Sequence, residues 1–276
     1  MKISRYWTRA QGEFPGTGNQ TLKVKARGWS DESLDAARTK ALEVARRVAE
    51  RIAGGESGGK YPYGDRPLPE PVIREFTGAM VTRNKYGALV LNTDQMMFVD
   101  VDRKTAPAKS GLLSSLFGKP KPAASAEDPV IEELAGITSR HNLAARLYET
   151  AAGYRLIVTS APFKPGSADA EALLTAYKSD PLYIRLCRMQ ESFRARLTPK
   201  PWRCGYPKRY LDYPFETAQD RELAQRWESD YGLRSAAFAT CRFIRDVGSG
   251  SFRGDFRELV DFHDRETKAM QARPLA

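Results

Sequence analysis

Residues 95–103 constrain the fold of this chain more strongly than any other stretch of it. Residues 96–99 are four consecutive apolar side chains, Met-Met-Phe-Val, and they run directly into Asp100-Val101-Asp102. An unbroken apolar run that ends abruptly in charge is typical of a strand that is buried on both faces. We therefore predict a central strand here, with two carboxylates at its end.

The two carboxylates of this stretch are candidate metal ligands. Side chains at i and i+2 share a face of a strand, so Asp100 and Asp102 are expected to point the same way. Neighbouring carboxylates repel each other and are costly to desolvate, and a bridging Mg²⁺ or Mn²⁺ ion removes that cost. The alternative is a strand that ends in solvated loop acids, with Asp102 paired to Arg103.

The composition is that of an ordinary globular protein without membrane spans. The chain has 276 residues, enough for one large domain or two small ones. It has no apolar run near the roughly 18 residues that cross a bilayer, and its first residues lack the apolar segment of a secretory signal. Its three cysteines are too widely spaced for a disulfide framework or a zinc pattern, and its two histidines disfavour a histidine-pair mechanism. We therefore expect a cytoplasmic protein without membrane association.

The charge of the chain points to an anionic partner. The formal net charge is +10, and nucleic acids or nucleoside triphosphates are the first partners to consider for such a balance. Residues 185–209 contain one acid, Glu191, and eight basic residues: Arg185, Arg188, Arg194, Arg196, Lys200, Arg203, Lys208 and Arg209.

Aromatic residues lie among these cations. Trp202, Tyr206 and Tyr210 are interleaved with them, and cations next to aromatic rings suit phosphate contacts combined with base stacking. We predict that Arg194, Arg196, Lys200, Trp202 and Arg203 contact nucleotide or nucleic acid. The alternative is a basic rim whose aromatic side chains belong to the core.

The hydrophobic periodicities predict an α+β fold, with an RRM-like or palm-like, antiparallel-rich sheet and helices mainly on one face. Residues 1–55 are predicted to form a strand–strand–helix unit packed on the core, because apolar side chains recur every three to four residues over 34–52. Residues 56–276 are predicted to form the core. Residues 104–127, rich in Ala, Pro, Ser and Lys, are predicted to be a flexible surface insertion.

Local signals place further elements of the core. Capping residues predict helices that begin at Asp128, Ser167, Asp180 and Thr217. A short helix is expected over residues 69–76. Strands at 79–84 and 88–92 are expected to form a meander with the Asp-x-Asp strand.

One strand end in this meander carries two polar candidates. Arg83 and Asn84 lie where the strand over 79–84 meets the turn Lys85-Tyr86-Gly87. There they either face a bound ligand or close the turn.

The order of these motifs resembles that of a known superfamily. An Asp-x-Asp strand comes first, a hairpin around Ala151-Ala152-Gly153-Tyr154-Arg155 follows, and an Arg-rich strand comes third. Over roughly residues 79–245 this layout resembles the archaeo-eukaryotic primase–polymerase superfamily. The resemblance implies an RRM-like catalytic palm in which Asp-x-Asp binds two metal ions.

The same resemblance implies two further site features. A histidine of the hairpin contacts the nucleotide phosphate in that superfamily; here Arg155 stands at its place, and arginine also binds phosphate. A third acid on a later strand completes the superfamily's metal site. For that role Asp212 and Asp246 are the candidates in this chain.

Three functions are consistent with these features. The first is a metal-dependent nucleotidyltransferase of primase–polymerase type, with Asp100, Asp102 and Arg155 as catalytic residues and Mg²⁺ or Mn²⁺ as cofactor. The second is a non-catalytic module that binds RNA or single-stranded DNA through residues 185–209. The third is a metal-dependent phosphoesterase or nuclease. The sequence leaves the oligomeric state open.

Overall fold

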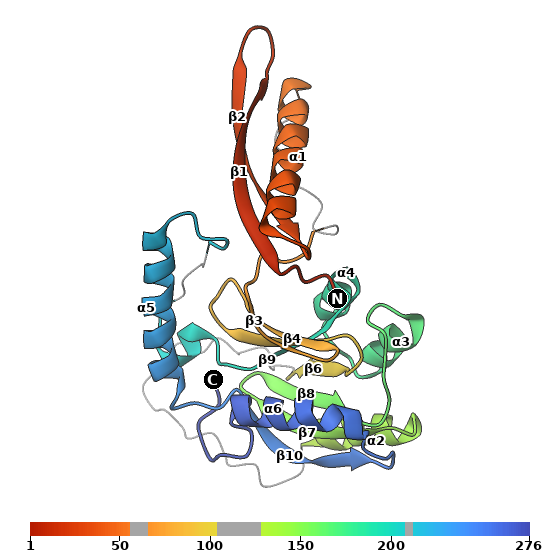
Figure 1. Cartoon of the computed structure of the whole chain (residues 1–276). Helices are drawn as coiled ribbons and strands as arrows, with labels where there is room; N and C mark the ends of the chain where they lie inside the picture. The colour runs from red at the N-terminus through yellow and green to blue at the C-terminus, as the bar shows by residue number, and fades with distance from the viewer. Residues whose placement is uncertain (56–65, 104–127, 208–211) are drawn as a thin grey trace, which may run out of the picture.

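The chain folds into a body and an arm that projects from it (Figure 1). The structure is a computed structural model that describes residues 1–55, 66–103, 128–207 and 212–276. The predicted insertion at 104–127 lies outside the described residues. The fold is α+β with antiparallel sheets, as the sequence predicts.

The arm consists of one hairpin and one helix. Its elements are β1 (Tyr6–Pro15), β2 (Thr21–Ser30) and α1 (Leu34–Ala53). Ser33 caps α1 by accepting a hydrogen bond from an amide of its first turn. The helix buries small side chains against the hairpin, and it lies so close that a Cβ at Gly28 would be 2.0 Å from the carbonyl oxygen of Ala37. Glycine is therefore required where the strand meets the helix.

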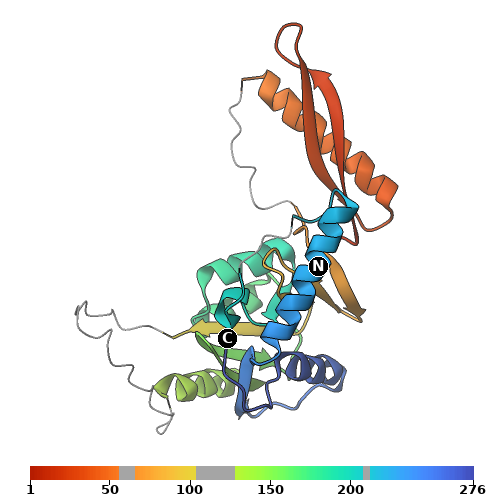
Figure 2. The ribbon, with the colours of Figure 1, turned by 90° about the vertical axis from the view of Figure 1, so that its left-hand side faces the viewer.

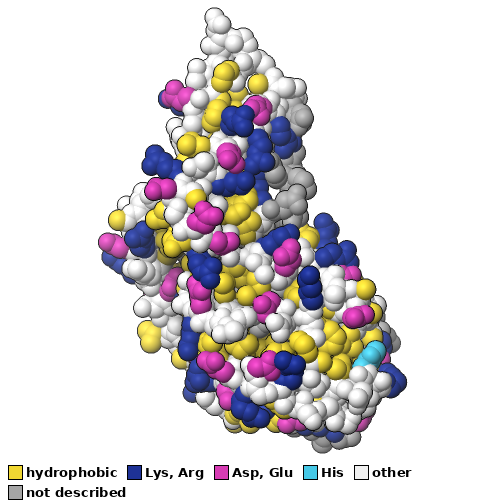
Figure 3. Space-filling model, turned by 45° about the vertical axis from the view of Figure 1, so that its right-hand side comes forward, with side chains coloured by type: hydrophobic (Ala, Val, Ile, Leu, Met, Phe, Trp, Pro, Cys, Tyr) yellow, Lys and Arg dark blue, Asp and Glu magenta, His cyan; other side chains and the backbone are white. Residues whose placement is uncertain are grey.

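Ion pairs attach the base of the arm to the segment that precedes α5 (Ala218–Ser235) (Figure 2). Arg9 contacts both Asp212 and Glu216 at 2.7 Å. Lys25 also pairs with Glu216, and Arg27 pairs with Asp212. The basic side chains that the sequence places on one face of β2 are thus partly neutralised by acids of the body. On the face of the molecule in Figure 3, basic side chains are interspersed with acidic ones along the arm and the body.

The first sheet of the body has the strand order β10-β7-β8-β6. Its strands are β6 (Phe98–Asp102), β7 (Ala144–Thr150), β8 (Gly153–Val158) and β10 (Cys241–Gly248). The helices around it are α2 (Pro129–Arg140), α3 (Ala168–Ala176), α4 (Pro181–Gln190) and α6 (Arg257–Thr267).

Helices cover both faces of this sheet rather than mainly one. His263 of α6 packs on Tyr148, which shares a face with Arg155 and Asp100 because the three residues are cross-strand neighbours. Tyr154, whose side chain points to the other face, donates a hydrogen bond to Asp128 at the start of α2.

The second sheet has the order β3-β4-β5-β9. Its strands are β3 (Val72–Phe76), β4 (Ala79–Arg83), β5 (Leu89–Thr93) and β9 (Phe193–Arg196). The short helix predicted over 69–76 is wrong: this segment contains β3, because pairing with β4 and its β-branched residues favour a strand. The predicted meander is right for its first two strands, since β4 pairs with β5, and wrong for its third, since β5 pairs next with β9 and β6 belongs to the first sheet.

The Asp-x-Asp strand is an edge strand, although its apolar run predicts a central one. Among the described strands, β6 pairs only with β8, and β8 is buried along its whole length. The free edge of β6 is covered by β9, which lies beside it without strand pairing, and by α4, whose Tyr183 hydroxyl donates to the carbonyl oxygen of Phe98 at 3.0 Å. Burial by neighbouring elements therefore produces the same apolar pattern as a central position in a sheet.

Candidate functional site

Asp100 and Arg155 form an ion pair at the junction of the two sheets. The residues face each other across β6 and β8, with Arg155 Nε 2.9 Å from Asp100 Oδ1 and Nη2 3.3 Å from Oδ2. The Arg155 side chain is fully enclosed, whereas 42% of the Asp100 side chain is exposed. Although burial alone lowers the pKa of Arg155, the charge and hydrogen bonds of Asp100 raise it overall. Arg155 therefore stays charged.

The third contact of this guanidinium ties the sheets together. Arg155 Nη1 donates to the carbonyl oxygen of Arg196 on β9 at 2.9 Å. The superfamily resemblance implies a phosphate contact for Arg155, but in this structure its donors reach a carboxylate of one sheet and the backbone of the other. Arg155 thus fixes the position of Asp100 relative to β9.

Three cations lie beyond this pair, and we call Arg196, Lys200 and Arg203 the cation cluster. The pKa of Arg196 is lowered to about 10, because its surroundings remove water from the guanidinium and because Arg155 and Arg203 repel its charge. The pKa of Lys200 is lowered by burial and by Arg196 and Arg203, against the attraction of Asp102. Together with the hydrogen bond from Arg155 to the backbone of Arg196, these effects indicate that Arg196 and Lys200 lie near the two carboxylates.

Arg196 is the member of the cation cluster that has a buried donor without a partner. Its Nε atom is buried without a hydrogen-bond partner. In the part of the chain that the structure describes, no carboxylate lies within ion-pair distance of its guanidinium. A partly buried cation without an ion pair is costly in a protein interior, so an anion placed there would relieve that cost.

The structure gives three predicted ligand residues other contacts. Arg194 pairs with the buried Glu70 at 2.8 Å. Arg83 lies 3.1 Å from Glu228 of α5 and donates to the carbonyl oxygen of Gly87. Asn84 accepts hydrogen bonds from two amides of its own turn. Of the two alternatives left open for Arg83 and Asn84, the structure supports the closing of the turn.

Trp202 lies at the surface beside the cation cluster. It belongs to the short helix η1 (Pro201–Cys204), and 44% of its surface is exposed. Tyr86 packs against it edge-on, with ring centroids 5.4 Å apart. Tyr86 was not among the predicted ligand residues, although its place in a Lys-Tyr-Gly turn is a signal for an exposed aromatic side chain.

The structure does not bring either candidate third acid to Asp100 and Asp102. Asp212 binds the arm through Arg9 and Arg27. Asp246 lies on β10, three strand spacings or about 14 Å across the sheet from β6. Among the described residues, no group of three or more His, Cys, Asp or Glu side chains could hold a metal ion. A Mg²⁺ ion at the two carboxylates would take its other ligands from water and from the oxygen atoms of a bound phosphate.

A second arrangement resembles a nucleophilic site but is closed to substrate. Cys241 Sγ lies 4.0 Å from His263 Nε2, and His263 Nδ1 lies 3.0 Å from Asp264 Oδ1. Both Cys241 and His263 are fully buried. Burial raises the pKa of the Cys241 thiol to about 11 and that of Cys187 to about 12. His263 acts as a packing residue in the core.

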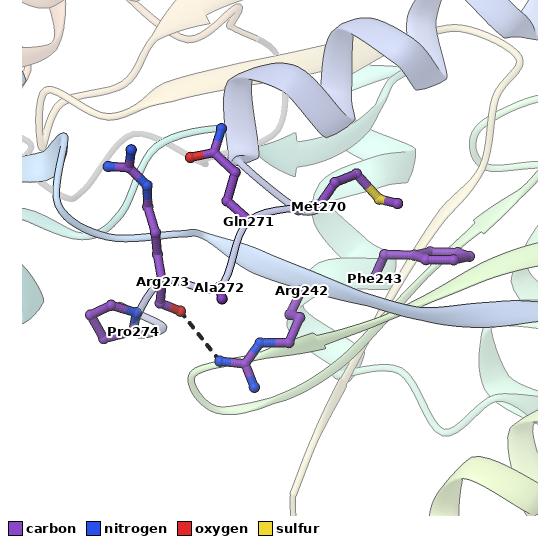
Figure 4. A pocket seen from close by; sticks show the side chains of 8 residues that line it. Arg242, Phe243, Met270, Gln271, Ala272, Arg273 and Pro274 are labelled. Carbon is purple, nitrogen blue, oxygen red and sulfur yellow. Dashed lines mark hydrogen bonds between the residues drawn. The ribbon is translucent and has the colours of Figure 1, made fainter.

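A surface pocket of about 640 Å³ lies near the end of the described chain (Figure 4). It lies between β10 and residues 269–274, with Phe243 and Met270 on one side. Arg242 donates to the carbonyl oxygen of Arg273 and pairs with Glu149. None of the residues that the sequence singles out for chemistry lines this pocket, and its arginine on β10 is already engaged. The cation cluster is therefore the stronger candidate site.

Comparisons of the chain with protein-family models, with curated proteins and with solved structures find no match. No helix in the described parts of the chain is both long and apolar enough to cross a membrane.

Proposed function

We propose that this protein binds the phosphate groups of a nucleotide or nucleic acid at the cation cluster. The observation that carries the proposal is the guanidinium of Arg196, which is partly buried beside other cations and has an unpartnered Nε atom. Guanidinium groups bind phosphate through parallel charge-assisted hydrogen bonds. A phosphate group would satisfy that atom and neutralise the repulsion within the cluster.

The position of the cation cluster also supports this proposal. Asp100 and Asp102 lie at the end of β6, and Arg196 lies at the end of β9. These strands come from different sheets and lie side by side. Ligands of open α/β sheets bind where neighbouring strands diverge, because the strand ends leave space there. The site is an analogous position in an antiparallel fold.

A second candidate function adds metal-dependent nucleotidyl transfer to phosphate binding. The observation that favours it is the shared direction of Asp100 and Asp102, which both interact with Lys200. Asp102 is exposed, and Asp100 keeps part of its surface open beside Arg155. Together with phosphate oxygens these two carboxylates would hold Mg²⁺ or Mn²⁺, which would neutralise the transferring phosphate and activate a hydroxyl.

Calorimetry with inorganic triphosphate and with a nucleoside triphosphate tests both proposals. Arg196→Met should weaken binding of both ligands at least tenfold, because charge-assisted hydrogen bonds contribute about 1.5–3 kcal/mol. Arg226→Gln is the matched control, since it removes one positive charge from an exposed position on α5. No binding to the wild-type protein, or equal binding to Arg196→Met, would refute the phosphate site.

The metal-dependent function has its own readout in the same assay. Adding Mn²⁺ should strengthen triphosphate binding by the wild-type protein but not by Asp102→Asn. Asp102 is the residue to change, because removing the Asp100 carboxylate would also leave Arg155 unpaired. Equal Mn²⁺ effects on the two proteins would remove the metal site and leave the phosphate site standing.

A further inference from the structure

Trp202 offers an exposed aromatic ring directly beside the cation cluster. Its neighbour in sequence, Arg203, belongs to the cluster, and Lys200 Nζ lies 5.6 Å from the centre of its ring. Lys200 also interacts with Asp102 and Arg196. A phosphate held by Lys200 and Arg196 therefore lies within reach of any group that stacks on Trp202.

Contacts with α5 hold the turn that carries Trp202. The hydroxyl of Tyr231 donates to the carbonyl oxygen of Pro199 at 2.5 Å. Tyr231 in turn stacks on Trp227, with ring centroids 5.1 Å apart. Within the turn, the amide of Arg203 donates to the carbonyl oxygen of Lys200 at 2.9 Å. The ring of Trp202 is thus carried on a rigid support.

A second rigid turn supports the edge of Trp202. Tyr86 packs edge-on against it. Tyr86 lies between Asn84 and Gly87, and the Asn84 side chain accepts hydrogen bonds from two amides of the turn. Gly87 has a φ of +86°, and a Cβ there would be 2.0 Å from the ring of Trp227. The same tryptophan therefore anchors both turns, so the Trp202 ring is ordered before any ligand arrives.

We infer that Trp202, supported by Tyr86, is a stacking platform for an unpaired nucleobase whose phosphate is held by the cation cluster. This inference rests on the proposed phosphate site and adds the chemical class of its ligand. An exposed ring on a fixed support stacks a base without sequence preference, because every base has a flat face. Bases in a duplex hide those faces against each other, so the platform selects single strands or free nucleotides.

Two ligands of equal charge separate base stacking from phosphate binding. One is single-stranded oligothymidine of about twelve nucleotides, and the other is an abasic oligodeoxyribose phosphate of the same length. The wild-type protein should bind oligothymidine more tightly by about 5- to 150-fold, which is the range for stacking one base on an aromatic side chain. Trp202→Ala should abolish this difference while leaving abasic binding unchanged.

Two further variants test whether the aromatic ring of residue 202 causes the preference for oligothymidine. Trp202→Phe should restore most of the preference for oligothymidine, whereas Trp202→Leu, which is apolar but not aromatic, should not. Equal preferences in the Leu and Phe variants would overturn stacking. Quenching of tryptophan fluorescence by oligothymidine should disappear in Trp202→Phe, although the other three tryptophans remain.

The outcomes distinguish the platform from the phosphate site itself. Equal wild-type affinity for oligothymidine and abasic ligand, together with equal affinity for thymidine triphosphate and inorganic triphosphate, would overturn the platform and leave the phosphate site intact. Binding of neither ligand would overturn the phosphate site, and the platform with it. Duplex binding that equals single-strand binding and is insensitive to Trp202→Ala would also overturn the platform. A Trp202-dependent preference for thymidine triphosphate over inorganic triphosphate would assign the platform to free nucleotides; a preference seen only with the oligomer would assign it to single strands.

Discussion

Replacing Arg196 by methionine should stabilise this protein while it removes phosphate binding. Methionine keeps the apolar stem of the side chain and deletes the guanidinium, whose Nε atom is buried without a partner. The carbonyl oxygen that accepts from Arg155 belongs to the backbone of residue 196 and is unaffected. The substitution therefore removes an uncompensated charge without breaking the contact between the sheets.

The size of the stabilisation follows from the pKa of Arg196. A pKa lowered to about 10 from the ordinary value of a guanidinium corresponds to roughly 3 kcal/mol against the charged form. The side chain is only partly buried, and solvent screening reduces this figure to about 1–2 kcal/mol. The pKa of this basic group is lower in the folded state than in the unfolded state, so its positive charge destabilises the fold. This destabilisation is fully present at neutral pH, and it fades as the pH rises through about 10, where the folded protein loses the proton.

Thermal unfolding of the two proteins measures this gain. A gain of about 1–2 kcal/mol should raise the melting temperature of a chain of this size by roughly 2–6 °C. Inorganic triphosphate should raise the melting temperature of the wild-type protein more than that of Arg196→Met, because the variant binds it at least tenfold more weakly. A variant less stable than wild type between pH 6 and 8 would show that the guanidinium is already satisfied, and would refute the reasoning for an anion site.

Three further predictions follow from the contacts. Asp100→Asn should destabilise the protein by about 2–3 kcal/mol in urea unfolding, because it leaves the buried Arg155 unpaired. Asp102→Asn, at an exposed position, should change the stability by less than about 0.5 kcal/mol. Equal effects of the two substitutions would contradict the roles assigned to the two carboxylates. Gly28→Ala should lower the free energy of unfolding by about 1–3 kcal/mol and speed hydrogen exchange in the arm, since the new Cβ would overlap the carbonyl oxygen of Ala37. Unchanged hydrogen exchange would show that helix and hairpin can separate without cost. All three thiols are buried, so they should react with a thiol reagent at pH 8 only after denaturant is added, and rapid labelling of the native protein would disprove that burial.

Local sequence signals predicted the helices of this protein better than the pairing of its strands. Asp128, Ser167, Asp180 and Thr217 each cap the helix expected after them, because a cap depends only on residues a few positions away. The partner of β5 is β9, about a hundred residues later in the chain. No short pattern around residues 88–92 contains that information, so the sequence predicted pairing with the next strand instead.

The site residues, like the secondary structure, could be predicted where the signal is local in the sequence and could not be predicted where it depends on remote partners. The periodicity of a strand placed Asp100 and Asp102 on one face, and the clustering of charge pointed to Arg196, Lys200 and Arg203. Which arginines already have partners could not be predicted, because those partners are remote in the chain. Arg194 pairs with Glu70, and Arg83 pairs with Glu228. Composition counts these arginines as free positive charge, whereas the fold uses them as internal ion pairs.

The late position of β9 in the chain has a kinetic consequence. Residues 193–196 complete the second sheet only after a loop of about a hundred residues has closed between β5 and β9, and contacts at such separation form slowly. Arg196 comes close to Asp100 and Arg155 only when this closure has occurred. The rate at which triphosphate binding recovers during refolding would therefore report the rate at which β9 pairs with β5. The arm is built from neighbouring segments and is expected to fold earlier.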